Sequence, residues 1–101
     1  MDKEQALAYA REYARAVYKE MNPEQVVLYG SYAKGNARAD SDIDIAVIFN
    51  GLEQDWFQTY TRLAGLTWKI STYIEPILLD RAKESGGFIS EVLRTGQPII
   101  I

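Results

Sequence analysis

Residues 25–49 read QVVLYGSYAKGNARADSDIDIAVIF. Two runs rich in apolar β-branched and aromatic residues are joined by a linker of small and polar residues. Such runs, bounded by turn-forming residues, are typical of strands. We therefore predict strands over 25–29 and 42–49, with a tight loop or a turn of helix over 31–37 and a loop over 36–41.

Helices are predicted on both sides of this stretch, where apolar residues recur at three- and four-residue steps. The first begins after Asp2, which forms a capping-box-like pair with Gln5, and ends at Asn22-Pro23. A second helix is expected over 53–69. A last helix is expected over 86–94.

The remaining signals lie toward the C-terminal end of the sequence. A third strand is predicted over 70–79, and Pro76 within it indicates an edge strand or a bulge. Ser85 is the expected cap of the last helix. Gly96 is expected to close that helix in the left-handed conformation, and Pro98 to stop it.

The resulting order is α-β-(short α)-β-α-β-α. Long crossovers between strands predict an α/β or α+β fold with a small mixed sheet covered by helices. We expect one domain over 1–101, because the sequence has no repeats, no linker and a length suited to one core. Strand order does not follow from this pattern.

Composition excludes several classes of function. The chain has no cysteine and no histidine, which removes thiol catalysis and zinc-finger sites and points to a hard ion such as Mg²⁺ or Mn²⁺ if a metal is bound. A net charge of −3 argues against a freestanding nucleic-acid binder. No apolar run approaches about 20 residues, so we expect no membrane span and a cytoplasmic location.

Asp42 and Asp44 are separated by one residue in the alternating second strand. Their side chains are therefore expected on one face, with Cα atoms about 6.6 Å apart. Two carboxylates this close repel each other and need a counter-charge, which Mg²⁺ could supply. The alternative interpretation is a polar strand end with two solvated aspartates.

Gly30-Ser31 precedes this pair and ends the first strand. A glycine lets backbone approach a ligand closely, and the free N–H groups at a strand-to-helix junction favour anions. Lys34 and Arg38 could contact a phosphate there. Taken singly, these residues could also form a plain turn and two solvated surface cations.

Glu75 is the candidate for a third carboxylate, because it is the only charged residue between Lys69 and Asp80. If its strand pairs beside residues 42–49, Glu75 could complete a two-metal site or act as a base. Otherwise it is an edge-strand residue that faces water.

The stretch GSYAKGNARADSDIDIAV resembles the signature of the nucleotidyltransferase superfamily that includes DNA polymerase beta, and is similar to the minimal nucleotidyltransferases of bacteria and archaea. The resemblance implies that Gly30 and Ser31 hold a nucleoside triphosphate. It implies that Asp42 and Asp44 hold two Mg²⁺ ions. Glu75 stands where the family commonly has a third aspartate, and Lys34 where many relatives have arginine.

The resemblance also implies a function. An Mg²⁺-dependent enzyme of this kind transfers AMP from ATP to a hydroxyl, and minimal members are antitoxins that modify a tyrosine of a HEPN-type helical toxin. A non-catalytic antitoxin that neutralises its partner by binding is the first alternative. A small-molecule enzyme of the aminoglycoside type is the second.

Aromatic residues in the second predicted helix bear on partners: Trp56, Phe57, Tyr60 and Trp68. They are either core residues or more than one helix can bury in so small a domain. Exposed apolar patches usually mark interfaces. The second interpretation predicts a complex with a helical partner, or a homodimer when the protein is alone.

Overall fold

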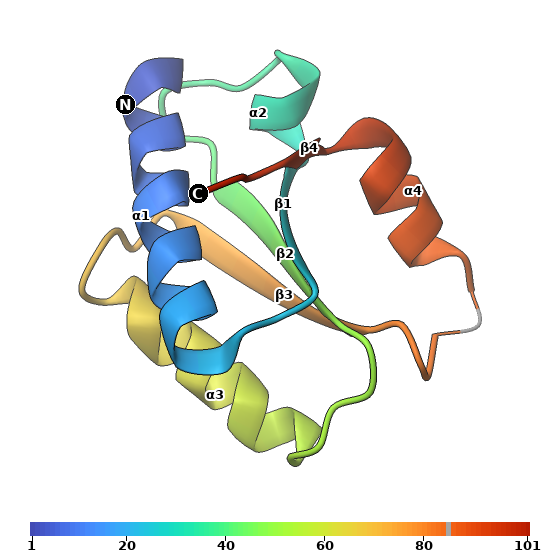
Figure 1. Cartoon of the computed structure of the whole chain (residues 1–101). Helices are drawn as coiled ribbons and strands as arrows, with labels where there is room; N and C mark the ends of the chain where they lie inside the picture. Colours follow the sequence, from blue (N-terminus) through green and yellow to red (C-terminus); the bar gives the residue numbers. More distant parts are fainter. Residues whose placement is uncertain (85) are drawn as a thin grey trace.

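A computed structural model describes residues 1–84 and 86–101 (Figure 1). The helices and strands follow in the order expected from the sequence, with one further strand at the end. They are α1 (Lys3–Met21), β1 (Gln25–Tyr29), α2 (Ser31–Lys34), β2 (Ile43–Phe49), α3 (Trp56–Thr67), β3 (Ile74–Asp80), α4 (Phe88–Thr95) and β4 (Gln97–Pro98).

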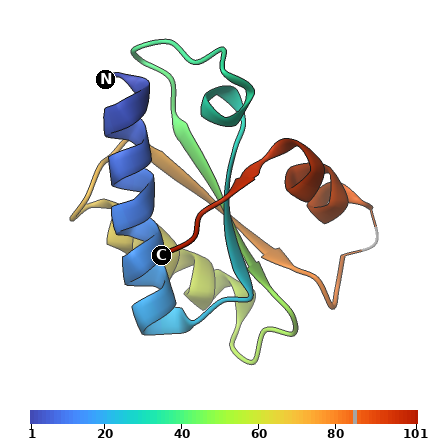
Figure 2. The same cartoon turned by 45° about the horizontal axis from the view of Figure 1, so that its top comes forward.

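The strands form one mixed sheet in the order β3-β2-β1-β4. Strand β1 runs antiparallel to β2 and to β4, whereas β2 and β3 are parallel. Helices α1 and α3 lie on one side of this sheet, and α4 lies on the other (Figures 1 and 2). The predicted α/β fold with a mixed sheet flanked by helices is confirmed.

Alternation along β2 divides the apolar residues between two cores. Ile43, Ile45 and Val47 point toward α1 and α3, and Ala46 and Ile48 point toward α4. On the first side the buried Tyr13 hydroxyl of α1 donates a 2.7 Å hydrogen bond to the carbonyl of Leu63 in α3. On the second side Ile89 and Val92 of α4 cover the sheet.

The start of α1 and its end agree with the sequence. The Asp2 carboxylate accepts a 2.8 Å hydrogen bond from the Gln5 amide, which confirms the predicted cap. Asn22 ends the helix in the left-handed conformation.

None of the helices within residues 1–84 and 86–101 has both the length and the apolar character to span a bilayer.

The predicted bounds of the third strand are wrong at its start. Strand β3 begins at Ile74 rather than at residue 70. The amides of Ile70 and Ser71 both bond to the carbonyl of Thr67, so the chain is still turning out of α3 there. The prediction from Pro76 is confirmed, because β3 is an edge strand, where a missing N–H leaves no ladder bond unmade.

The end of α4 also differs from the prediction. Gly96 is extended, with φ −90° and ψ 178°, and not left-handed. A β-carbon at Gly96 would lie 2.6 Å from the Val92 carbonyl oxygen and 2.9 Å from that of Leu28, so close packing requires glycine there. Pro98 belongs to β4, which the sequence analysis did not predict. The proposed cap Ser85 lies outside the described residues.

Candidate functional site

The candidate site is built where β1 ends and β2 and β3 begin. Asp44 is the register partner of Tyr29 in β1 and of Glu75 in β3. Register partners point to the same face of a sheet, so these three side chains form a row across three strands. Asp42 lies one residue before β2. Asp42 and Glu75 are exposed, and Asp44 is half-buried.

This row lies on the same face as Ala46, on which α4 packs, because Asp44 and Ala46 are two residues apart in β2. Glu75 therefore lies beside strand 42–49, which was the condition for a role with the aspartates. The sequence left open whether that strand pairs with β2, and the structure brings the Asp44 and Glu75 positions together.

Gly30 connects the end of β1 to α2, with φ 71° and ψ −146°. This backbone conformation is essentially restricted to glycine. A β-carbon built on Gly30 would overlap the Oδ2 atom of Asp44. The close approach that glycine allows is thus to Asp44. It brings the start of α2 against Asp44 and its neighbours Asp42 and Glu75, and we call these three carboxylates the acidic row.

Asp42, Asp44 and Glu75 bring negative charges close together, and no cation among the described residues pairs with them. Burial raises the pKa of the Asp44 carboxyl above its usual range, and the charges of Asp42 and Glu75 raise it further. Burial, with smaller contributions from Asp44 and Glu75, raises the pKa of Tyr29 to about 12. None of the three acidic side chains forms an ion pair within the part of the chain that the structure describes.

These residues fit a divalent metal by their chemistry. All donors are carboxylate oxygens, which suit Mg²⁺, and a cation would remove the repulsion that raises the pKa of Asp44. Among the described residues, no group of three acidic side chains already has an arrangement that could hold a metal ion. To share one ion, Asp42, Asp44 and Glu75 would have to adjust their side chains.

The predicted phosphate-binding residues lie at different distances from the acidic row. Ser31 is the first residue of α2 and follows Gly30 directly, so it lies beside the acidic row. Lys34 is exposed at the end of α2 and contributes, after Arg94, to lowering the pKa of Glu91 in α4. The charge of Lys34 therefore acts on the helix that covers the same side of the sheet.

Arg38 lies elsewhere in the loop. It lines a small hollow of about 180 Å³ together with the N-terminal residues Met1, Asp2 and Lys3. The Tyr32 hydroxyl donates to the Arg38 carbonyl, and the Arg38 amide donates to the Ser41 hydroxyl. The structure brings the Arg38 backbone near the N-terminus and does not bring it into the acidic row.

Two aromatic residues at the site, Tyr29 and Phe88, were not predicted from the sequence. Tyr29 stands in the row with Asp44, and its ring meets that of Phe88 of α4 edge-on, with centroids 6.4 Å apart. The signal for Tyr29 was its place at the end of a predicted strand. Its alignment with Asp44 depends on strand register, which the sequence pattern does not give.

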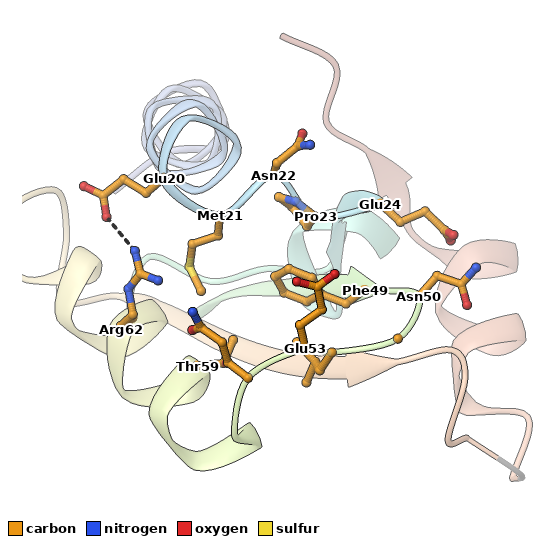
Figure 3. Close-up of a pocket in the computed structure, with 13 residues that line it drawn as sticks. Glu20, Met21, Asn22, Pro23, Glu24, Phe49, Asn50, Glu53, Thr59 and Arg62 are labelled. Atoms are coloured by element: carbon orange, nitrogen blue, oxygen red, sulfur yellow. Dashed lines mark ion pairs between the residues drawn. The ribbon is translucent and has the colours of Figure 1, made fainter.

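A larger hollow, of about 600 Å³, lies at the other end of β2 (Figure 3). Phe49, the last residue of β2, lines it, and Arg62 reaches toward Glu20 across one side with an N–O distance of 3.9 Å. None of the candidate site residues lines this hollow. Cavity volume alone would therefore have indicated a different site from the one that the carboxylates mark.

Asp80, which was not predicted as a functional residue, binds the backbone of the turn that lines this hollow. The Asp80 side chain accepts hydrogen bonds from the amides of Gly51, Leu52 and Ala82, at 2.8, 3.2 and 3.1 Å. The bond from Gly51 is the main reason that the pKa of Asp80 lies below its usual range. This residue shapes the turn after β2 and has no place in the acidic row.

A comparison with protein families matches one family over most of the chain. The family described as "Polymerase beta, Nucleotidyltransferase" matches residues 12–101. A crystal structure of an inferred nucleotidyltransferase from Sulfolobus solfataricus is similar over 95% of this chain and 80% of that chain, with a TM-score of 0.73 and 26% identity.

A second solved structure, a toxin-antitoxin with AMP-PNP, is similar over 89% of this chain and 72% of that chain, with a TM-score of 0.65. At 24% identity this likeness concerns the fold. No curated protein matches the sequence.

Proposed function

The chain belongs to the polymerase beta nucleotidyltransferase family, and from this premise we propose that it transfers AMP from ATP to a hydroxyl group of a partner protein. The observation that carries the proposal is the acidic row. Asp44 and Glu75 are register partners on one face, Asp42 stands two residues before Asp44, and no described cation neutralises them. A structural ion cluster would be expected to include its counter-charge.

The proposed reaction needs little covalent chemistry from the protein. The oxygen of the acceptor hydroxyl attacks the α-phosphorus of ATP, the bond from that phosphorus to the α,β-bridging oxygen breaks, and pyrophosphate leaves. Glu75, exposed at the edge of the row, accepts the proton of the hydroxyl. Mg²⁺, when bound, would stabilise negative charge on the phosphates and lower the pKa of the acceptor hydroxyl.

Asp42, Asp44 and Glu75 are the proposed holders of two Mg²⁺ ions. Asp44 is the central one, since its carboxyl is half-buried between the other two charges and against Gly30. Glu75 is thus given two roles, as ligand and as base. Both roles require its carboxylate form, and both would be lost in Glu75→Gln.

Gly30 and Ser31 are the proposed triphosphate-binding residues, because they adjoin the row where the chain enters α2. Lys34, on the same side of the molecule as α4, is the proposed cation for a distal phosphate. Arg38 would reach the nucleotide only if the loop that carries it rearranged, because it lies beside the N-terminus.

The proposed acceptor is a tyrosine of a HEPN-type helical toxin, which makes this chain an antitoxin. Two points support it: the resemblance of GSYAKGNARADSDIDIAV to minimal nucleotidyltransferases, and the structural likeness to a toxin-antitoxin that contains AMP-PNP. A non-catalytic antitoxin is the second candidate. No observation favours a small-molecule acceptor.

The test is to co-express the chain with the protein encoded by the adjacent gene and to measure the intact mass of that protein. The proposal predicts a mass increase of whole AMP units, absent with the variant that carries Asp42→Ala and Asp44→Ala. If the double variant relieves toxicity as well as the wild type does, binding alone is the function.

A further inference from the structure

The outer face of α3 carries an apolar stripe with a regular size pattern. Its residues are Phe57, Thr61, Ala64 and Trp68, which we call the α3 stripe. They are spaced by four, three and four residues, so they lie along one side of a helix over about 16 Å. Phe57 is 69% exposed and Trp68 is 79% exposed, although both are large apolar residues.

The α3 stripe is separate from the buried face of the helix. Thr59, Leu63 and Thr67 face the sheet and α1, and all three are buried. At 100° per residue, the α3 stripe lies roughly a third of a turn away from them. Trp56 stacks on Tyr60 beside it, with ring centroids 5.5 Å apart. Phe57, Thr61 and Trp68 are exposed and Ala64 is half-buried, so the helix presents a second, largely apolar side that the described residues leave mostly uncovered.

We infer that the α3 stripe is the interface of a homodimer in which α3 packs antiparallel against α3 of a second copy. A two-fold interface brings each residue of one chain to a different residue of the other unless it lies on the axis. Phe57 and Thr61 are four residues apart, and so are Ala64 and Trp68. In the antiparallel arrangement each Phe57 therefore meets a Trp68, and each Thr61 meets an Ala64.

The sizes of these residues fit that pairing. The small side chains of Thr61 and Ala64, beside the open Gly65, occupy the middle of the stripe, where two helix axes must come closest. The large rings of Phe57 and Trp68 stand at the two ends. A few residues contribute most of the affinity of a protein interface, and tryptophan is enriched among them.

The charges at the ends of α3 select the antiparallel direction. Glu53 and Asp55 precede the helix, and Lys69 follows it. Antiparallel packing places the acidic end of one copy beside Lys69 of the other, whereas parallel packing places like charges together. The α3 stripe itself carries no charge, and the nearby Arg62 reaches toward Glu20 of its own chain. Association therefore need not desolvate an unpaired ion.

The first test measures the oligomeric state of the full chain by sedimentation equilibrium over a wide concentration range. Wild type is expected to be a reversible dimer. Phe57→Glu is expected to raise the dissociation constant at least about thirtyfold, equivalent to about 2 kcal/mol, because it replaces a large apolar contact with a charge that dimerisation would bury. Gln58→Glu is the matched control, because it adds the same charge one position away from the stripe and should leave the dimer intact.

The second test determines the direction of packing. The chain has no cysteine, so single cysteines introduced by Thr61→Cys or Ala64→Cys have no background. A mixture of the two variants should form the 61–64 disulfide faster than either variant forms a disulfide with itself. Faster 61–61 or 64–64 bonding would overturn the antiparallel arrangement.

Two further results would overturn the inference. One is that the wild-type protein is a monomer at every concentration. If Phe57→Glu then weakens binding of a helical partner, the α3 stripe binds that partner and not a second copy. The other is a dimer that Phe57→Glu and Trp68→Lys leave unchanged while circular dichroism shows both variants folded, which would place the interface elsewhere.

Discussion

Asp44 and Glu75 face the same side of the sheet as register partners in adjacent parallel strands, with no described cation between them. Repulsion of this kind is tolerated at functional sites, where a ligand supplies the missing charge. The half-buried position of Asp44 makes the repulsion stronger, because its carboxylate is shielded less by water. This pair therefore links the fold to the proposed chemistry.

Magnesium should stabilise the protein, and more so as Asp44 ionises. At a free concentration ten times its dissociation constant, Mg²⁺ should add about 1.4 kcal/mol and raise the melting temperature by about 6 °C. The folded-state pKa of Asp44 is raised, so the effect should vanish as pH falls through that value and the carboxyl takes up a proton. Differential scanning fluorimetry over pH measures it.

The control for this prediction is Asp44→Asn. Without metal, wild-type stability should fall as pH rises through the raised pKa of Asp44, because the folded state releases its proton there at a cost. Asp44→Asn should lack both this fall and the response to Mg²⁺, while folding normally. Equal responses of the variant and the wild type to Mg²⁺ would mean that the ion binds elsewhere.

Gly30→Ala should damage both stability and the site. The backbone conformation at Gly30 costs other residues about 1–3 kcal/mol, and the new β-carbon would overlap the Asp44 carboxylate. We expect a loss of at least about 3 kcal/mol in urea unfolding once both effects add.

Gly35→Ala is the matched control, since φ is also positive there, at +79°, but the added β-carbon meets nothing within 4 Å. It should lose only the conformational cost, about 1–2 kcal/mol. Equal losses for the two variants would show that contact with Asp44 is not what requires glycine at position 30.

The carboxylate of Asp80 should make the protein sensitive to acid. The pKa of Asp80 is lowered in the folded state, chiefly by the hydrogen bond from Gly51. The stability that the Asp80 carboxylate confers is therefore present above its unfolded-state pKa of 3.8, and it is lost as pH falls through the folded-state pKa. The difference in unfolding free energy between wild type and Asp80→Asn should therefore shrink in this acidic range. Asp40→Asn, at an exposed carboxylate, is the comparison, and a constant difference for Asp80→Asn would contradict the account.

Gly96→Ala tests close packing between α4 and β1. Its φ is negative, so alanine causes no backbone strain, yet the β-carbon would press on the Val92 and Leu28 carbonyl oxygens. Overpacking of this kind costs about 1–3 kcal/mol. Gly86→Ala, where the β-carbon meets nothing within 4 Å, should change stability by less than about 0.5 kcal/mol. Similar values for the two would show that α4 can move away.

The sequence predicted those features of the fold that depend on short-range patterns. The Asp2 cap, the end of α1 at Asn22, and the alternation of β2 were all readable, because each depends on neighbours within four residues. Gly96 was misjudged, since glycine after a helix usually serves a left-handed turn, and only the packing of α4 on β1 shows the other reason.

Only the local part of the site could be predicted, because local patterns do not give strand order. Alternation placed Asp42 and Asp44 on one face, but the pairing of Asp44 with Glu75 and Tyr29 depends on strand order, which no local pattern carries. The sequence left open whether the aromatic residues of α3 are core or exposed. Trp56, Phe57 and Trp68 are exposed and Tyr60 is half-buried, because Thr59, Leu63 and Thr67 fill the buried side of α3. What covers those aromatic residues stays a proposal.

The most direct measurement of the central claim is the fate of two labels on ATP. The chain is incubated with Mg²⁺, the product of the adjacent gene, and ATP labelled at either the α- or the γ-phosphate. We predict label on the partner from the α position only, with loss of at least about a thousandfold in rate for Asp44→Asn. Label from the γ position, or equal labelling by wild type and Asp44→Asn, would contradict nucleotidyl transfer by the acidic row.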